Sequence, residues 1–232
     1  MLERLKEEVL QANLLLETAG LVALTWGNVS GIDRGRGLVV IKPSGVPYAD
    51  LKVEQLVVVT LDTGATVEGA LRPSSDTPTH LVLYREFPAI GGICHTHSES
   101  ATTFAQAGRA LPCFGTTHAD HFYGPVPLCR PLTAEEVAED YETNTGHAIV
   151  ELFRREKLDP VAMPAVLQAY HAPFTWGKSA TAAVHNSIAL ESCARMALGS
   201  LTLNPTLAPL PQHILDKHYL RKHGPGAYYG QK

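Results

Sequence analysis

The chain has 232 residues, of which 45% are hydrophobic and 18% are charged, so it is long and apolar enough to bury a sizeable core. Its formal net charge of −4 excludes a general electrostatic attraction to nucleic acids or membrane surfaces. The N-terminus is too charged for a signal peptide, and no apolar run is long enough to span a bilayer. The four cysteines form no CxxC pair. We therefore expect one domain over residues 1–232 with reduced thiols, located in the cytoplasm.

The first third of the chain predicts one helix followed by strands and turns. Apolar residues recur at helical spacing from Leu2 to Leu16, and Gly20 can end that helix. Alternating or β-branched apolar runs predict the strands that follow. These runs are residues 24–31, running into a turn, 38–45, ending in a polar turn, 56–61, and 65–69 after a hairpin turn.

Helices and strands alternate through the rest of the chain. Thr77 is expected to cap a helix that has Pro78 at its first position and stops before Pro88. A strand over 89–98, a helix over about 100–107 and a loop over 116–125 are expected next. A capping box at 133–136 opens a helix to about 155, and an apolar strand-like stretch over 165–171 is followed by a turn at 173–177. The last expected elements are a helix through 201 capped by Ser179, a helix over about 211–223 and a tail at 226–230. This order predicts a three-layer α/β/α fold with a mixed, largely antiparallel central sheet.

Two histidines end the apolar run over residues 89–98. Because side chains alternate along a strand, His95 and His97 should point to the same side and form half of a metal site. His171 also ends an apolar segment, and sheet geometry can bring it beside them. Asp76 is expected as a fourth ligand or as a group that orients a histidine. Three imidazoles and a carboxylate favour Zn²⁺, with Mn²⁺ or Co²⁺ as alternatives.

A pair of histidines at this spacing is more often structural than metal-binding when it stands alone. Other histidines in the sequence have no comparable setting, and we expect them to be ordinary polar or surface residues; they are His80, His147, His185, His213 and His223.

Three short loops share hydroxyl or amide side chains and exposed backbone N–H groups, which suits a small phosphate monoester. Taken singly, each loop is more often only a turn. Lys42 adds a positive charge to one of them, and no Walker or Rossmann glycine pattern points to a nucleotide. The loops are 27–30, 42–45 and 73–75.

Taken together, these motifs make the chain similar to the class II aldolase/adducin-like family, and within it most closely to the L-ribulose-5-phosphate 4-epimerases. The resemblance runs essentially from end to end. The segments that carry it are 24–30, 42–46, 73–80, 91–98, 115–120, 216–224 and the tail at 228–230.

The resemblance implies a role for particular residues. It implies zinc bound by His95, His97 and His171 with Asp76 as a further ligand, and Asp120 and Tyr229 as an acid/base pair. It implies phosphate binding by Gly27, Asn28, Ser44, Gly45, Ser74 and Ser75, beside Lys42 from the loop composition. It places Thr116, Glu142, His218 and Arg221 near the site, where they would orient Tyr229 or contact substrate. In the alternative interpretation, Glu142 lies on a solvated helix face, and His218 and Arg221 form a basic last helical turn.

The family also implies an assembly and a substrate. The expected assembly is a homotetramer with C4 symmetry, in which Asp120 and Tyr229 meet across a subunit interface. The expected substrate is a phosphorylated ketopentose from a pathway such as arabinose or ascorbate catabolism. Residues 168–173 depart from the epimerase pattern. A bulkier Tyr170 and Ala172 can alter the pocket wall, and together with Ala169 they leave the fine substrate preference open.

The expected reaction interconverts L-ribulose 5-phosphate and D-xylulose 5-phosphate. Because the C4 hydrogen is not acidic, a retro-aldol cleavage of C3–C4 is the reasonable route, with a metal ion stabilising the enediolate. One alternative is an aldolase acting on a deoxyketose 1-phosphate such as fuculose 1-phosphate. The other is a non-enzymatic adducin-like interaction domain, which the three histidines argue against.

Overall fold

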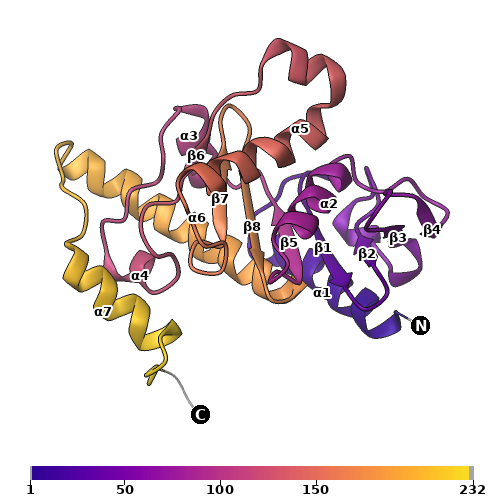
Figure 1. Cartoon of the computed structure of the whole chain (residues 1–232), viewed down its shortest axis with the longest axis horizontal. Helices are drawn as coiled ribbons and strands as arrows, with labels where there is room; N and C mark the ends of the chain where they lie inside the picture. Colours follow the sequence, from indigo (N-terminus) through magenta and orange to yellow (C-terminus); the bar gives the residue numbers. More distant parts are fainter. Residues whose placement is uncertain (1, 230–232) are drawn as a thin grey trace.

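The computed structural model describes residues 2–229, and its strands form one mixed sheet (Figure 1). Within that range the strands are β1 (Asn28–Asp33), β2 (Leu38–Ile41), β3 (Val57–Thr60), β4 (Thr66–Glu68), β5 (Gly92–His95), β6 (Leu128–Cys129), β7 (Ala165–Gln168) and β8 (Pro173–Gly177). Their order across the sheet is β4-β3-β2-β1-β5-β8-β7-β6. Neighbouring strands are antiparallel, except that β6 and β7 are parallel.

Helices cover both faces of this sheet. The α-helices of the described residues are α1 (Glu3–Thr18), α2 (Thr77–Glu86), α3 (Glu99–Gln106), α4 (Thr116–Ala119), α5 (Ala134–Arg155), α6 (Ala180–Leu203) and α7 (Gln212–His223). Short 3₁₀ turns, Tyr48–Asp50 and Val53–Gln55, lie between β2 and β3. In the part of the chain that the structure describes, no helix combines the length and apolarity needed to cross a membrane.

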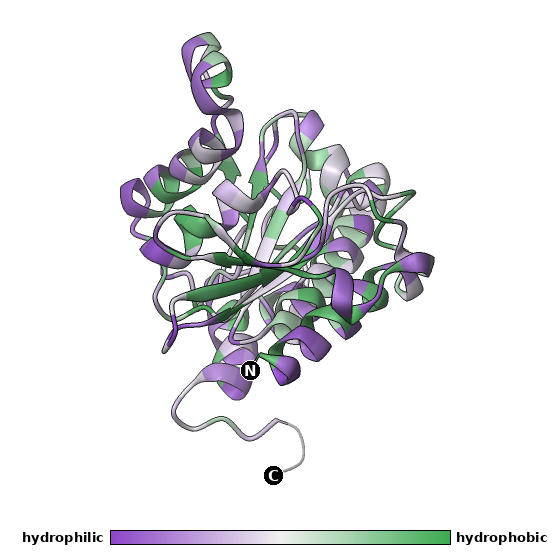
Figure 2. Cartoon of the chain, turned by 90° about the vertical axis from the view of Figure 1, so that its right-hand side faces the viewer, coloured by the Kyte–Doolittle hydropathy of each residue, from purple (hydrophilic) through white to green (hydrophobic). Residues whose placement is uncertain are grey.

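Alternation along the strands creates the two apolar layers. In β2, Val39 and Ile41 pack in one core with α2 and α5, while Val40 between them packs in a second core with α1 and the start of α6. Figure 2 shows apolar strands inside and hydrophilic helix surfaces outside. The predicted three-layer α/β/α fold with a mainly antiparallel sheet is confirmed.

Three local predictions were wrong. A turn precedes β1, because Leu24 has φ 55° and pairing with β5 begins only at Asn28, so the strand expected from Leu24 starts later. Residues 173–177 form strand β8 and not a turn, since Pro173 is tolerated at a strand's first position and Phe174 and Trp176 are buried. Residues 116–119, expected as a loop, form the short helix α4.

One helix start and one helix interior also differ from expectation. Thr77 is already helical in α2, and Asp76 precedes it as the capping residue. Helix α5 begins at the predicted capping box, in which Thr133 Oγ accepts the Glu136 N–H at 3.3 Å, but it is interrupted at Asp140. The turns before Asp140 project from the body at the top of both views (Figures 1 and 2). The one-domain prediction over residues 1–232 and the tail to Gly230 extend to residues 1 and 230–232, which lie outside the described residues.

Candidate metal centre and phosphate pocket

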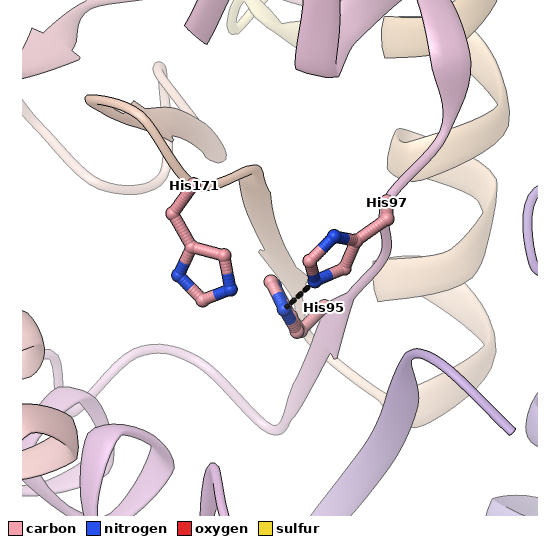
Figure 3. Close-up of side chains that lie close together, drawn as sticks. All are labelled: His95, His97 and His171. Carbon is pink, nitrogen blue, oxygen red and sulfur yellow. Dashed lines mark hydrogen bonds between the residues drawn. The ribbon is translucent and has the colours of Figure 1, made fainter. Parts of the chain in front are cut away.

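Three imidazoles converge where strands β5, β7 and β8 meet. His95 is the last residue of β5, His97 follows two residues later, and His171 lies in the turn between β7 and β8. Ligand atoms from the three rings all lie within 4.8 Å of one another, and the Nε2 atoms of His95 and His97 are 3.2 Å apart. Figure 3 shows the three rings facing a common point. The structure thus brings together the three histidines that the sequence singled out.

The environment keeps these imidazoles neutral. Burial, helped by the neighbouring rings, lowers the pKa of His95 and His171 to about 3, and burial also lowers the pKa of His97. The Nδ1–H of His95 donates to the Pro173 carbonyl at 2.9 Å, which leaves the Nε2 lone pair for a ligand, and its ring stacks on Phe174 at 4.2 Å. Neutral nitrogen ligands suit Zn²⁺, so this donor set fits a catalytic zinc site with an open position.

Asp76 lies in the wall of the same pocket. Its carboxylate Oδ2 accepts a hydrogen bond from Asn28 Nδ2 at 2.6 Å, and its charge opposes the burial that lowers the pKa of His97 and His171. Among the described residues the cluster of possible metal ligands comprises the three histidines. Ligation by Asp76 therefore stays a prediction, beside the alternative that it orients the site.

The loops with phosphate-binding composition line this pocket, a cavity of about 370 Å³. Two of them are tied together, since the Ser44 N–H donates to Arg72 O and the Ser74 N–H donates to Lys42 O, both at 3.0 Å. At Gly27, φ is +80° and a Cβ would lie 2.9 Å from the His95 carbonyl oxygen. A side chain there would therefore collide with the backbone of β5, the strand that carries His95. The predicted binding residues on this pocket are Gly27, Asn28, Lys42, Ser44, Gly45, Ser74 and Ser75.

Lys42 is a buried cation in this pocket. Its side chain is almost fully buried, and burial lowers its pKa to about 8. The ammonium lies 3.5 Å from the Pro43 carbonyl and 4.8 Å from the centre of the Tyr48 ring. Buried charges are normally paired, so an anionic group bound beside Lys42 would supply a strong partner.

The predicted acid/base residues form a second cluster, built by α4, α7 and the segment after α7. Asp120 and Tyr229 both contact Arg221 of the same chain, so they come together without the subunit interface that was expected between them. Asp120 follows α4, and its carboxylate accepts hydrogen bonds from Arg221 at 2.7 and 3.1 Å and lies 3.1 Å from His218 Nδ1. Tyr229 is 59% exposed, with its ring over the charged groups of Arg221 and Lys222. Burial raises the pKa of Asp120, but the hydrogen bonds from Arg221 and His218 outweigh it and the net pKa is lowered.

The two clusters are separate within one chain. Among the described residues, the lining of the metal pocket includes Glu142 but none of Asp120, His218, Arg221 or Tyr229. Figure 1 shows α4 and α7 together on the far side of the molecule from β1, β2 and β3. Thr116 begins α4, and its carbonyl accepts the Asp120 N–H at 2.9 Å.

Outside the pocket lie the residues that depart from the epimerase pattern. Ala169 and Ala172 are buried, Tyr170 is 73% exposed, and none of the three lines the pocket. Within one chain these three residues lie outside the pocket lining, and their effect on substrate preference stays an open question.

Two residues near the metal centre were missed by the sequence reasoning. His80 was expected to be an ordinary polar or surface residue, but it is fully buried, with Nδ1 2.7 Å from Ser30 Oγ. His80 follows Asp76 by four residues, so a helix places both side chains on one face. This spacing is the sequence feature that could have indicated a position near the metal site. Tyr141 lines the pocket with its hydroxyl 3.4 Å from His171 Nδ1, and nothing in its local sequence marked it.

Comparisons with known proteins agree with this site. The family model for the class II aldolase and adducin N-terminal domain matches residues 7–198. L-ribulose-5-phosphate 4-epimerase UlaF from Salmonella paratyphi B (strain ATCC BAA-1250 / SPB7) is 53% identical over 231 residues, covering 100% of both chains. The protein of the same name from Salmonella typhi is also 53% identical over the full length.

Solved structures show the same architecture. An L-fuculose 1-phosphate aldolase superposes with a TM-score of 0.77 at 26% identity, covering 93% of this chain and 94% of that one. L-fuculose 1-phosphate aldolase from Glaciozyma antarctica PI12 has a TM-score of 0.78 at 19% identity, covering 97% and 84%, which shows the shared fold alone. The chain belongs to the class II aldolase and adducin family.

Proposed function

We propose that this protein is a zinc-dependent L-ribulose-5-phosphate 4-epimerase, an isomerase that interconverts L-ribulose 5-phosphate and D-xylulose 5-phosphate. The observation that carries the proposal is that three neutral imidazoles and the buried Lys42 line one pocket. A metal site beside an anion site suits a phosphorylated sugar. The choice of an epimerase is supported by the 53% identity to relatives of that name over the whole chain.

Each part of the pocket has a defined task in the reaction. His95, His97 and His171 would hold the metal ion, with Asp76 beside them. Such an ion supplies positive charge that stabilises an enediolate when the C3–C4 bond breaks. Deprotonation of the C4 hydroxyl starts the cleavage, which yields the enediolate of dihydroxyacetone and glycolaldehyde phosphate.

The phosphate loops keep the second fragment from leaving. The loops carrying Ser44 and Ser74 and the ammonium of Lys42 would hold its phosphate while the aldehyde turns. Attack on the opposite aldehyde face reforms the C3–C4 bond with inverted configuration at C4. The bound phosphate would thus be the fixed end about which the aldehyde group rotates.

Proton transfer on the two faces is the task proposed for Asp120 and Tyr229. A carboxylate and a phenol on opposite sides of C4 can each take up or return the hydroxyl proton. Because these residues do not line the metal pocket of their own chain, we propose a homotetramer in which a neighbouring subunit supplies them. The four cysteines are free and buried, which suits the cytoplasmic location we propose.

An aldolase acting on a deoxyketose 1-phosphate is the second candidate. It is favoured by the structural likeness to L-fuculose 1-phosphate aldolase, which has 26% identity. That activity uses the same metal pocket but needs no proton transfer on a second face of C4. A non-enzymatic role would leave the histidine cluster unexplained.

The decisive experiment assays the purified protein with L-ribulose 5-phosphate and follows the formation of D-xylulose 5-phosphate, with and without a chelator. We expect turnover that the chelator abolishes and zinc restores. Release of dihydroxyacetone phosphate from fuculose 1-phosphate, without epimerisation of ribulose 5-phosphate, would establish the aldolase instead. Absence of both reactions in metal-loaded protein would overturn the enzymatic proposals.

A further inference from the structure

Helix α5 restarts next to the metal pocket. Asp140 has φ −162° and ψ 91°, so the helix is interrupted there. Its side-chain Oδ1 accepts the Thr143 N–H at 3.2 Å, which is the bond that a helix N-cap makes with the third residue after it. Tyr141 is therefore the first residue of a separately capped helical segment.

This new helix start is fixed against the pocket. Tyr141 and Glu142 both line the cavity that contains the three histidines. The Glu142 carbonyl accepts the Thr79 hydroxyl at 2.6 Å, and the Tyr141 carbonyl accepts the Thr145 hydroxyl at 2.9 Å. The backbone that carries Tyr141 is thus held from α2 and from within α5.

The hydroxyl of Tyr141 reaches the outer nitrogen of His171. Its oxygen lies 3.4 Å from Nδ1, and the two ring centres are 6.0 Å apart. In Figure 3 the His171 nitrogen next to the side-chain stem points away from the other two rings, while the second nitrogen points toward them. His95 is arranged in the same way, with Nδ1 on the Pro173 carbonyl and Nε2 toward His97.

His171 needs such a partner more than His95 does. It lies in the tight turn between β7 and β8 and directly follows Tyr170, whose φ of 61° is unusual for a bulky residue. Among the described residues, the hydrogen-bond partner of the His171 ring is Tyr141. Outer partners of metal-bound histidines fix the ring orientation and the tautomer.

We propose that Tyr141 is a positioning residue for the metal ligand His171: its hydroxyl oxygen accepts the Nδ1–H and holds the Nε2 lone pair toward the metal ion. The inference rests on the proposed function, because it takes the three histidines as the metal site. Tyr141 touches the ligand and not the reacting atoms, so its effect is on how tightly and in what geometry the ion is held.

The test measures Co²⁺ binding to the full-length, metal-free protein by titration and by visible absorption. Tyr141→Phe keeps the ring and removes the acceptor, so we expect Co²⁺ affinity to fall about 10-fold or more and the d–d bands to change. Tyr170→Phe is the matched control, because it removes a hydroxyl from the residue adjacent to His171 but outside the pocket. We expect this control to bind Co²⁺ as the wild type does.

Thermal unfolding of the metal-free variants checks that both are folded, and the rate of Co²⁺ loss to a chelator gives a second readout. Tyr141→Phe with wild-type affinity, spectrum and loss rate would overturn the positioning role and leave the proposed function intact. A wild-type protein that takes up no Co²⁺ would overturn both.

Discussion

A single buried histidine, His80, ties together the polar groups behind the metal pocket. Its Nδ1 atom lies 2.7 Å from Ser30 Oγ, which lies 2.9 Å from the Tyr84 hydroxyl. Burial lowers the pKa of His80 to about 3, against the opposing charge of Asp76. The imidazole therefore stays neutral in the folded protein under conditions that protonate it in the unfolded chain.

This difference predicts a loss of stability in mild acid. Below about pH 6.5 the unfolded chain binds a proton at His80 and the folded protein does not, so falling pH favours unfolding. From this histidine alone, the free energy of unfolding of the metal-free protein should fall by about 2 kcal/mol between pH 7 and pH 5. Urea unfolding at the two pH values measures it.

His80→Asn provides the control, since it removes the titrating group. Whatever the stability of the variant at pH 7, its free energy of unfolding should fall by about 2 kcal/mol less than that of the wild type between pH 7 and pH 5. Equal losses in the two proteins would show that His80 is not the source of the acid sensitivity.

The exposed phenol of Tyr229 carries a different kind of prediction. Tyr229→Phe removes a proposed proton donor without touching the metal pocket, so kcat for epimerisation should fall by about 10²- to 10⁴-fold. Its zinc content should match that of the wild type, whereas His97→Asn should lose bound zinc. Rate assays and metal analysis on the same samples separate the two effects, and a fully active Tyr229→Phe would refute the assignment.

Single residues differ in how far the sequence reveals them. His95 and His97 could be paired because strand alternation is a local rule, although the strand ends at His95. The burial of His80 could not be predicted in the same way. It depends on Ser30 of β1 lying against α2, which is a contact between segments 50 residues apart.

Among the elements, α5 combines a packed helix after Asp140 with a projecting arm, which is the part of α5 before Asp140. Arg130 donates two hydrogen bonds of 2.8 Å to the Glu136 carboxylate, and Asn144 donates to the Glu136 carbonyl at 2.9 Å. These bonds hold the arm at Glu136, while Asp140 caps the segment that follows. The cap gives the rest of α5 its own start at the pocket.

Loss of that cap should destabilise the protein measurably. Asp140→Ala removes the acceptor for the Thr143 N–H, and we expect the free energy of unfolding to fall by about 1 kcal/mol. Glu139→Ala, on the exposed arm, should change it by less than about 0.5 kcal/mol. Urea unfolding of both metal-free variants measures the difference, and equal stabilities would contradict the capping role.

The elements that were predicted wrongly from the sequence are those whose structure depends on contacts with residues far away in the chain. β8 looked like a turn because it begins with Pro173 and ends with Gly177, but pairing with β5 and β7 makes it a strand. The longer helices were predicted well because periodicity and caps are local, as with Ser179, whose hydroxyl accepts the Ala182 N–H at 3.3 Å. The break at Asp140 was missed because the helical pattern continues through it.

On the scale of the whole molecule, the chain holds two half-sites that do not meet within it. The proposed metal and phosphate half lies where β1, β5 and the β7–β8 turn come together, and the proposed acid/base half lies at α4 and α7. Pattern and spacing alone could not link Asp120 to the histidines, and that link came only from the family resemblance. Within one chain the structure also leaves Asp120 away from the histidines, and the proposed homotetramer is the arrangement that would bring them together.

Mixing two inactive variants tests that assembly. His97→Asn spoils the metal half and keeps Tyr229, whereas Tyr229→Phe keeps the metal half and lacks the phenol. If each site joins halves from neighbouring subunits of a ring, a randomly reassembled equal mixture should regain about a quarter of the wild-type activity, because one interface in four pairs two intact halves. If both halves come from the same chain, every site in the mixture stays defective and reassembly restores nothing. Each variant reassembled alone is the control, and activity no higher than theirs would exclude a shared site.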